Sequence, residues 1–166
     1  MRPIRRSYLI ELTVGTTQPS NGSKLTFDDI SELRGVYITG VEAFFRNSIN
    51  TSPGGKVVPL DTAGPGLVLS LQDTKSSTPA YQYPVTDLMP RNNGGFYRDL
   101  EPFALNLNKS YVTVLDNTGL LANYSLVFNM FFLYRSEFIK LVQLGKLTTL
   151  DESILQEVGQ LKGGRK

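Results

Sequence analysis

The sequence predicts an all-β fold: an antiparallel β-sandwich, a single jelly roll of about eight strands, followed by short C-terminal α-helices. Two observations lead to this prediction. Short apolar segments recur between turn residues, with 15 Gly and 9 Pro but only 19% charged residues. Near residue 135 the apolar spacing then changes from the period of a strand to that of a helix. We therefore expect a sandwich domain over residues 1–135 and a helical appendage with a basic tail over residues 136–166.

The first half of the chain alternates apolar and polar residues in several segments. In the first of these, Tyr8, Ile10, Leu12 and Val14 occupy every second position, which is typical of a half-buried strand. A short helical turn is expected within residues 25–33, capped by Thr26. Further strands are predicted at residues 36–45, 56–60 and 67–72, where β-branched and apolar residues are enriched and Gly-Pro-rich turns intervene.

The second half continues the same pattern. A strand is predicted at residues 81–88, and Pro84 places it at a sheet edge or at a bulge. After the Asn-Asn-Gly-Gly turn at 92–95 we expect two short strands on either side of Pro102, at 96–100 and 103–107. A strand at 111–115 and a long one at 124–134 complete the set.

The last predicted strand is apolar on both faces. Leu126, Phe128, Met130, Phe132 and Tyr134 face one way, and Val127, Phe131 and Leu133 face the other. An outward-facing strand of a sandwich normally avoids such a pattern. The second face is therefore predicted to be covered, either by the C-terminal helices or by another subunit.

Two helices are predicted after residue 135. The first covers 136–146, and the second begins at Thr149–Glu152, which reads as a capping box in which Thr149 bonds the Glu152 amide. The second helix packs on its own sandwich or docks on a neighbouring subunit. The predicted partner interface comprises Val127, Phe131, Leu133, Ile154, Leu155, Val158 and Leu161.

The composition argues against catalysis. The chain contains no His, Cys or Trp, so the common nucleophile–base pairs and the imidazole or thiolate metal sites cannot form. We predict no catalytic, cofactor-binding or metal-binding residues, no small-molecule substrate and no enzymatic activity. Two alternatives stay open: a carbohydrate-binding or adhesin-type sandwich with exposed aromatic residues such as Tyr81, Tyr83 and Tyr97, and a His-free glycoside hydrolase with two carboxylates in a cleft.

Basic residues gather at the two ends of the chain. Three basic residues lie among the first six positions and three among the last five. Without these six, 11 of the 17 basic residues remain, against 15 acidic ones. This distribution suggests that the ends contact nucleic-acid phosphates or an acidic partner. The alternative is that these ends are simply solvated. The residues are Arg2, Arg5, Arg6, Lys162, Arg165 and Lys166.

No targeting or membrane segment is expected. Glu11 interrupts the first apolar segment, and Asn129 interrupts the longest one, which is too short to span a bilayer as a helix. We therefore expect synthesis in the cytoplasm and no transmembrane segment.

Two stretches carry a family resemblance, LRGVYITGVEA at residues 33–43 and LNLNKSYV at residues 105–112. They resemble bacteriophage virion structural proteins. The resemblance implies a single jelly roll with a minor capsid, penton or cement role, located in the virion. It also implies a homo-oligomer that contacts other capsid proteins, with the basic tails available to packaged nucleic acid. Beyond the fold-forming positions quoted, it transfers no functional residues.

Overall fold

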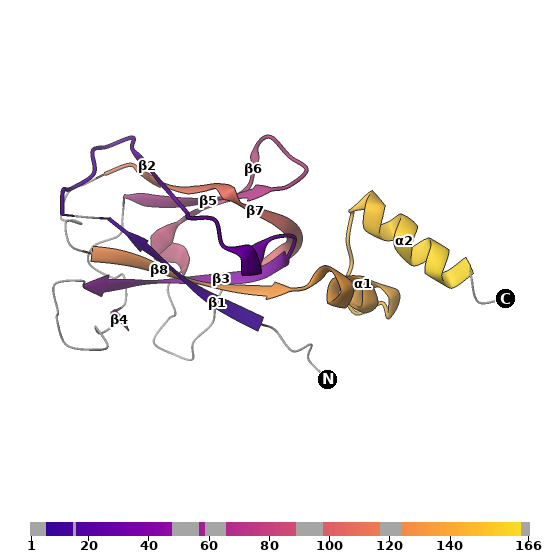
Figure 1. The fold of residues 1–166 in the computed structure, drawn as a ribbon. Helices are drawn as coiled ribbons and strands as arrows, with labels where there is room; N and C mark the ends of the chain where they lie inside the picture. The colour runs from indigo at the N-terminus through magenta and orange to yellow at the C-terminus, as the bar shows by residue number, and fades with distance from the viewer. Residues whose placement is uncertain are drawn as a thin grey trace.

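The structure is a computed structural model that describes residues 6–14, 16–47, 57–58, 66–88, 98–116 and 124–163. Its strands form two antiparallel layers, and two helices lie beyond one end of them (Figure 1). The predicted β-sandwich with short C-terminal helices is confirmed. The elements in chain order are β1 (Arg6–Thr13), β2 (Lys24–Thr26), η1 (Ser31–Leu33), β3 (Tyr37–Asn47), β4 (Val57–Val58), β5 (Leu67–Asp73), β6 (Pro79–Pro84), η2 (Val85–Leu88), β7 (Arg98–Val114), β8 (Tyr124–Leu133), α1 (Arg135–Gln143) and α2 (Glu152–Gly163).

The strand pairs are nested in the way that defines a jelly roll. The first strand pairs with the last, β1 with β8, while β2 pairs with the second half of β7 and β3 with its first half. The innermost pair is β5 with β6. One layer is therefore ordered β1-β8-β3-β7 and the other β2-β7-β5-β6, as expected when one long antiparallel hairpin is rolled up.

The strand β7 belongs to both layers. Residues 98–104 pair with β3, and residues 105–114 pair with β5 or β2. The prediction of three short strands here was wrong, because two irregularities bend the strand without ending it. The register with β3 shifts between the partners Asp99 and Phe103, where Pro102 lacks an N–H. A second shift precedes Tyr111, where the Ser110 hydroxyl donates to the Asn106 carbonyl at 2.8 Å.

The main core lies between the two layers. The inner faces of β1 and β8 contribute residues at every second position, such as Ile10, Leu12, Leu126 and Phe128, all buried. Across the sandwich they meet the buried leucines of β5 and β7. Phe27 packs edge-on against Phe128 with ring centroids 5.6 Å apart. The alternation seen in the sequence is thus the alternation between core and outer face.

Two local predictions need correction. Residues 24–26 form β2, and the helical turn is limited to η1 at 31–33, without the Thr26 cap; Asp29 forms an ion pair with Arg34. The strand β6 ends at Pro84, after which the chain forms η2. The edge position predicted from Pro84 is confirmed, because β6 is the last strand of its layer.

The helices α1 and α2 lie at the end of the sandwich where β8 finishes (Figure 1). Glu137 accepts the Tyr134 N–H at 3.1 Å at the start of α1, as in a capping box. Arg135 of α1 and Glu157 of α2 form an ion pair at 2.6 Å. Among the described residues, no helix is long and apolar enough to cross a membrane.

Candidate functional site

The two helices, which we call the helical appendage (residues 135–163), share a second core with the end of the sandwich. Phe138 is completely buried, and its ring stacks on Tyr37 of β3 with centroids 4.2 Å apart and planes 12° from parallel. Ile154 and Val158 of α2 lie four residues apart, so they share one helix face, and both are buried in this core. The appendage is therefore packed on its own sandwich.

Asp151 connects the appendage to two strands of the sandwich. Its carboxylate accepts hydrogen bonds from the Ser153 N–H at 3.0 Å and the Ile154 N–H at 3.4 Å, so it caps α2. The Tyr37 hydroxyl donates to the other carboxylate oxygen, Oδ2, at 3.2 Å. The Lys75 ammonium forms an ion pair with Oδ1, the oxygen that accepts the two backbone N–H groups. The predicted capping box was wrong: α2 begins at Glu152, two residues later than a cap at Thr149 would place its start. Thr149 Oγ1 accepts the Asp151 N–H at 3.1 Å instead.

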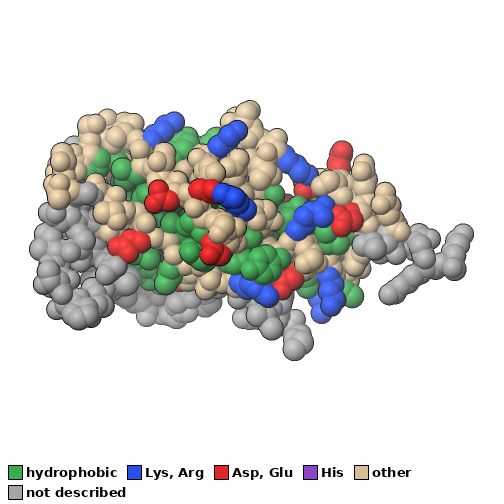
Figure 2. Space-filling view, viewed as in Figure 1, with side chains coloured by type: hydrophobic (Ala, Val, Ile, Leu, Met, Phe, Trp, Pro, Cys, Tyr) green, Lys and Arg blue, Asp and Glu red, His purple; other side chains and the backbone are tan. Residues whose placement is uncertain are grey.

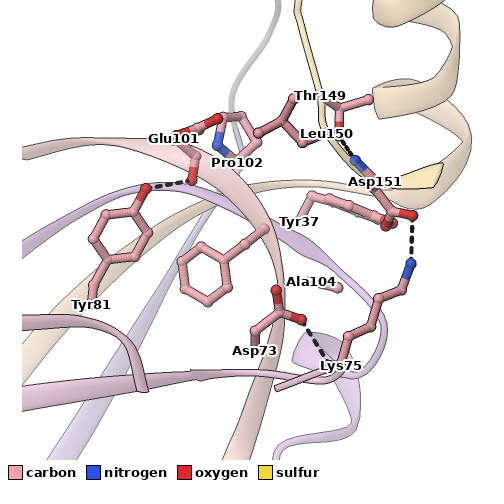
Figure 3. Close-up of a pocket in the computed structure, with 11 residues that line it drawn as sticks. Tyr37, Asp73, Lys75, Tyr81, Glu101, Pro102, Ala104, Thr149, Leu150 and Asp151 are labelled. Carbon is pink, nitrogen blue, oxygen red and sulfur yellow. Dashed lines mark hydrogen bonds and ion pairs between the residues drawn. The ribbon is translucent and has the colours of Figure 1, made fainter. Parts of the chain in front are cut away.

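A cleft of about 320 Å³ lies between the appendage and the sandwich (Figure 3). Tyr37 and Asp151 form one wall, Tyr81 and Glu101 another, and the exposed side chain of Leu150 lies at its border. The Tyr81 hydroxyl donates to the Glu101 carbonyl oxygen at 3.2 Å. Three acidic residues line this cleft: Asp73, Glu101 and Asp151.

The electrostatics of Asp151 and Tyr37 follow from their shared contact. Burial raises the pKa of the Asp151 carboxyl, but hydrogen bonds from Lys75 and Ser153 and the Lys75 charge outweigh it, so the pKa lies well below its usual range. Burial, together with the charge and hydrogen bond of Asp151, raises the pKa of Tyr37 to about 12. Because the pKa of Asp151 is lowered and that of Tyr37 is raised, the Tyr37 phenol stays neutral and donates its hydrogen bond to a charged Asp151 carboxylate.

The contacts of Asp151 with Tyr37 and Lys75 suit a structural role, in which Asp151 connects the appendage to the sandwich. A general acid for glycoside hydrolysis needs a raised carboxyl pKa, and Asp151 is shifted in the opposite direction. Asp73 accepts the Lys75 N–H at 2.9 Å within the turn after β5. Among the described residues, no group of three or more acidic side chains is placed to hold a metal ion.

The predicted partner interface divides into buried and exposed members. Leu133, Ile154 and Val158 are buried in the second core, where the appendage packs on its own sandwich. Val127 is also buried, and Phe131 is half-buried on the outer face of β8. Leu155 is 46% exposed, and the side chain of Leu161 lies outside the described residues. Among the members whose side chains are described, exposed surface comes chiefly from Phe131 and Leu155.

Of the predicted basic residues, the structure describes the side chain of Arg6. Its guanidinium donates to Glu137 at 2.8 Å and lies 4.8 Å above the Tyr134 ring, so it joins the start of β1 to α1. The side chains of the other five lie outside the described residues: Arg2, Arg5, Lys162, Arg165 and Lys166. On the face in Figure 2, the described acidic and basic side chains are interspersed.

The aromatic residues proposed for glycan binding are partly brought together. Tyr81 and Tyr83 stack with centroids 5.7 Å apart, and Tyr81 also packs against Phe103 at 5.2 Å. Tyr97 lies outside the described residues. Because the Tyr81 ring packs against two other aromatic rings and its hydroxyl is bonded to Glu101, this pair contributes mainly to packing.

The sequence prediction missed part of the apolar surface of the appendage. Leu144 is 58% exposed and Leu150 is 88% exposed, and both lie outside the two helices. Together with Tyr134 and Leu155, they make four of the six large apolar side chains exposed among the described residues. Leu150 precedes Asp151, a residue type that caps helices well, so a helix start at Glu152 would have placed Leu150 outside α2.

No protein-family model, curated protein or solved structure matches this chain. The fold and its contacts thus define a jelly-roll sandwich that carries a C-terminal helical appendage.

Proposed function

We propose that this chain is a structural protein of a virion, which assembles with copies of itself and with other capsid proteins in a minor capsid, penton or cement role. The observation that carries the proposal is the exposed apolar surface of residues 134–155, defined by Tyr134, Leu144, Leu150 and Leu155. Single exposed leucines are common, but their concentration in one short segment favours an interaction surface.

The energetics of this surface favour association. Complete burial of one leucine side chain contributes roughly 1.5–3 kcal/mol. Leu144, Leu150 and Leu155 are each at least 46% exposed, so about half or more of this free energy is still available to a neighbour. The internal core of the appendage and the Asp151 contacts hold the surface in place, which lowers the entropy cost of binding.

The appendage also suits assembly because it projects from one end of the sandwich (Figure 1). A neighbour can contact it there without disturbing the main core between the two layers. The family resemblance of residues 33–43 and 105–112 supports the virion role. In that role, the terminal basic residues would contact packaged nucleic acid through its phosphates.

The test is the mass of the protein in solution, measured by sedimentation or light scattering over a range of concentrations. We expect the wild type to form multiples of 18.4 kDa. The combined variant Leu144→Ser, Leu150→Ser, Leu155→Ser should form smaller assemblies than the wild type while keeping its far-ultraviolet circular dichroism. The matched control is Leu115→Ser, which replaces a leucine that is 59% exposed just after β7, outside the appendage. A wild type that stays monomeric throughout would refute the proposal.

A further inference from the structure

The edges of the two layers are not equally protected. The strand β2 has three residues, and β6 begins and ends with proline. The first half of β7 contains Pro102 beside a register shift, and its carbonyls at Glu101 and Ala104 accept hydrogen bonds from the Tyr81 hydroxyl and the Thr74 N–H. Short strands, prolines, bulges and covering contacts are the usual protections against edge-to-edge pairing.

The strand β1 is neither short nor interrupted by proline or a bulge. It runs for eight residues without proline, and its register with β8 is continuous from Arg6 to Thr13. It lies at the end of its layer, paired with β8. At its centre, Leu9 points to the outer face and is 63% exposed. Long, regular and partly apolar edges of this kind accept a further strand.

We propose that β1 pairs antiparallel with β1 of a second copy, about a two-fold axis at Leu9. The inference rests on the proposed assembly function and specifies one of its contacts. The pairing would join the β1 layers of two copies into one continuous sheet. It is isologous, so the same residues contribute from both subunits.

The side chains select this register. Paired residues must share a face, because otherwise the buried Ile10 and Leu12 would turn outward. An axis at Leu9 places Leu9 opposite Leu9, and Tyr8 opposite Ile10. An axis at Ile10 would instead oppose Leu9 with Glu11, and an axis at Tyr8 would leave residues 11–13 of β1 beyond the paired region.

The charges of β1 are compatible with the same register. With the axis at Leu9, Glu11 lies opposite Ser7 of the second copy, and Arg6 lies opposite Leu12. Like charges directly opposite each other would destabilise the pair. None face each other within the paired residues 6–12. The exposed Leu9 side chains cover each other at the axis.

The absence of cysteine allows a direct test by disulfide formation. Residues directly opposite in an antiparallel pair have Cα atoms about 4.5–5.5 Å apart, within the range that a disulfide spans. We expect Leu9→Cys to form a disulfide-linked dimer under mild oxidation. The matched control, Leu115→Cys, has similar exposure and should form far less.

A second pair of variants tests the register. A mixture of Ser7→Cys and Glu11→Cys should form the mixed disulfide, whereas Ser7→Cys alone should not, because its two copies would lie about 13 Å apart along the strands. Leu9→Lys places like charges at the axis and should weaken dimerisation by more than about tenfold.

The outcomes separate this inference from the proposed function. Leu9→Cys that cross-links no faster than Leu115→Cys overturns the β1 contact, even if the wild type is oligomeric through its appendage. Ser7→Cys cross-linking alone as efficiently as the mixture overturns the register. A monomeric wild type overturns both proposals, whereas a Leu9→Cys dimer, together with a Leu9→Lys variant whose assemblies are smaller than those of the wild type, supports the β1 pairing.

Discussion

The contact of Asp151 with Lys75 and Tyr37 gives a quantitative prediction for Asp151→Asn. Asparagine caps helices about as well as aspartate, so the variant keeps the bonds to the Ser153 and Ile154 N–H groups and loses the charge. Lys75 is 54% exposed, so its ion pair contributes less than about 1 kcal/mol. Replacing charged by neutral acceptors for Tyr37 and Ser153 costs about 1 kcal/mol more. We expect a total loss of roughly 1–2 kcal/mol.

The loss should appear in the appendage and should depend on pH. Hydrogen exchange of the α2 amides at pH 7 should become roughly tenfold faster for a loss of about 1.4 kcal/mol. Because the folded pKa of Asp151 lies below its unfolded value, the charge stabilises the protein above the unfolded pKa and ceases to do so as the pH falls. Urea unfolding should therefore show a difference between wild type and Asp151→Asn at pH 7 that shrinks between about pH 5 and pH 2.

The matched control is Asp73→Asn, which removes a carboxylate from the same cleft but from a turn, where it accepts the Lys75 N–H. This variant should leave α2 exchange almost unchanged. A difference between wild type and Asp151→Asn that is the same at pH 7 and at low pH would contradict the role given to the charge. Equal effects of the two variants on α2 would contradict the role given to Asp151 in holding the appendage.

Three further predictions concern the same end of the molecule. Tyr37→Phe should remove the late-titrating tyrosine, seen by absorbance near pH 12, and should reduce the loss of stability that the wild type shows as pH rises from 10 to about 12. Phe138→Ala should destabilise the appendage by about 3–5 kcal/mol in urea unfolding, because the ring is fully buried against Tyr37. Gly159→Ala should slow α2 hydrogen exchange by the equivalent of about 0.5–1 kcal/mol, because its added Cβ meets no atom within 4 Å.

The strands of the sandwich were largely predictable because their alternation is local. Ile10 and Leu12, for example, reveal the buried face of β1 without knowledge of its partner. The continuity of β7 was not predictable in this way. Pro102 and the polar stretch before Tyr111 resemble breaks in the sequence, and only the pairing with β3 and β5 shows that bulges absorb them.

The candidate site was less predictable because its contacts are distant in sequence. Thr149 and Asp151 are both good caps and lie two residues apart. The choice of Asp151 depends on Lys75 and Tyr37, which are 76 and 114 residues away. Likewise, the apolar outer face of β8 left open whether the appendage or another subunit would cover Leu133, because the alternation of a strand does not specify which element packs on it.

The two proposed contact surfaces meet at one corner of the molecule. Arg6, the first residue of β1, donates to Glu137 at 2.8 Å, and Glu137 accepts the Tyr134 N–H at the start of α1. Both members of this ion pair are about 40% exposed, so the pair contributes less than about 1 kcal/mol. The second core and Asp151 must therefore provide most of the attachment of the appendage. Because the Arg6 contact is weak, the start of β1 can adjust to a pairing strand while the appendage stays in place.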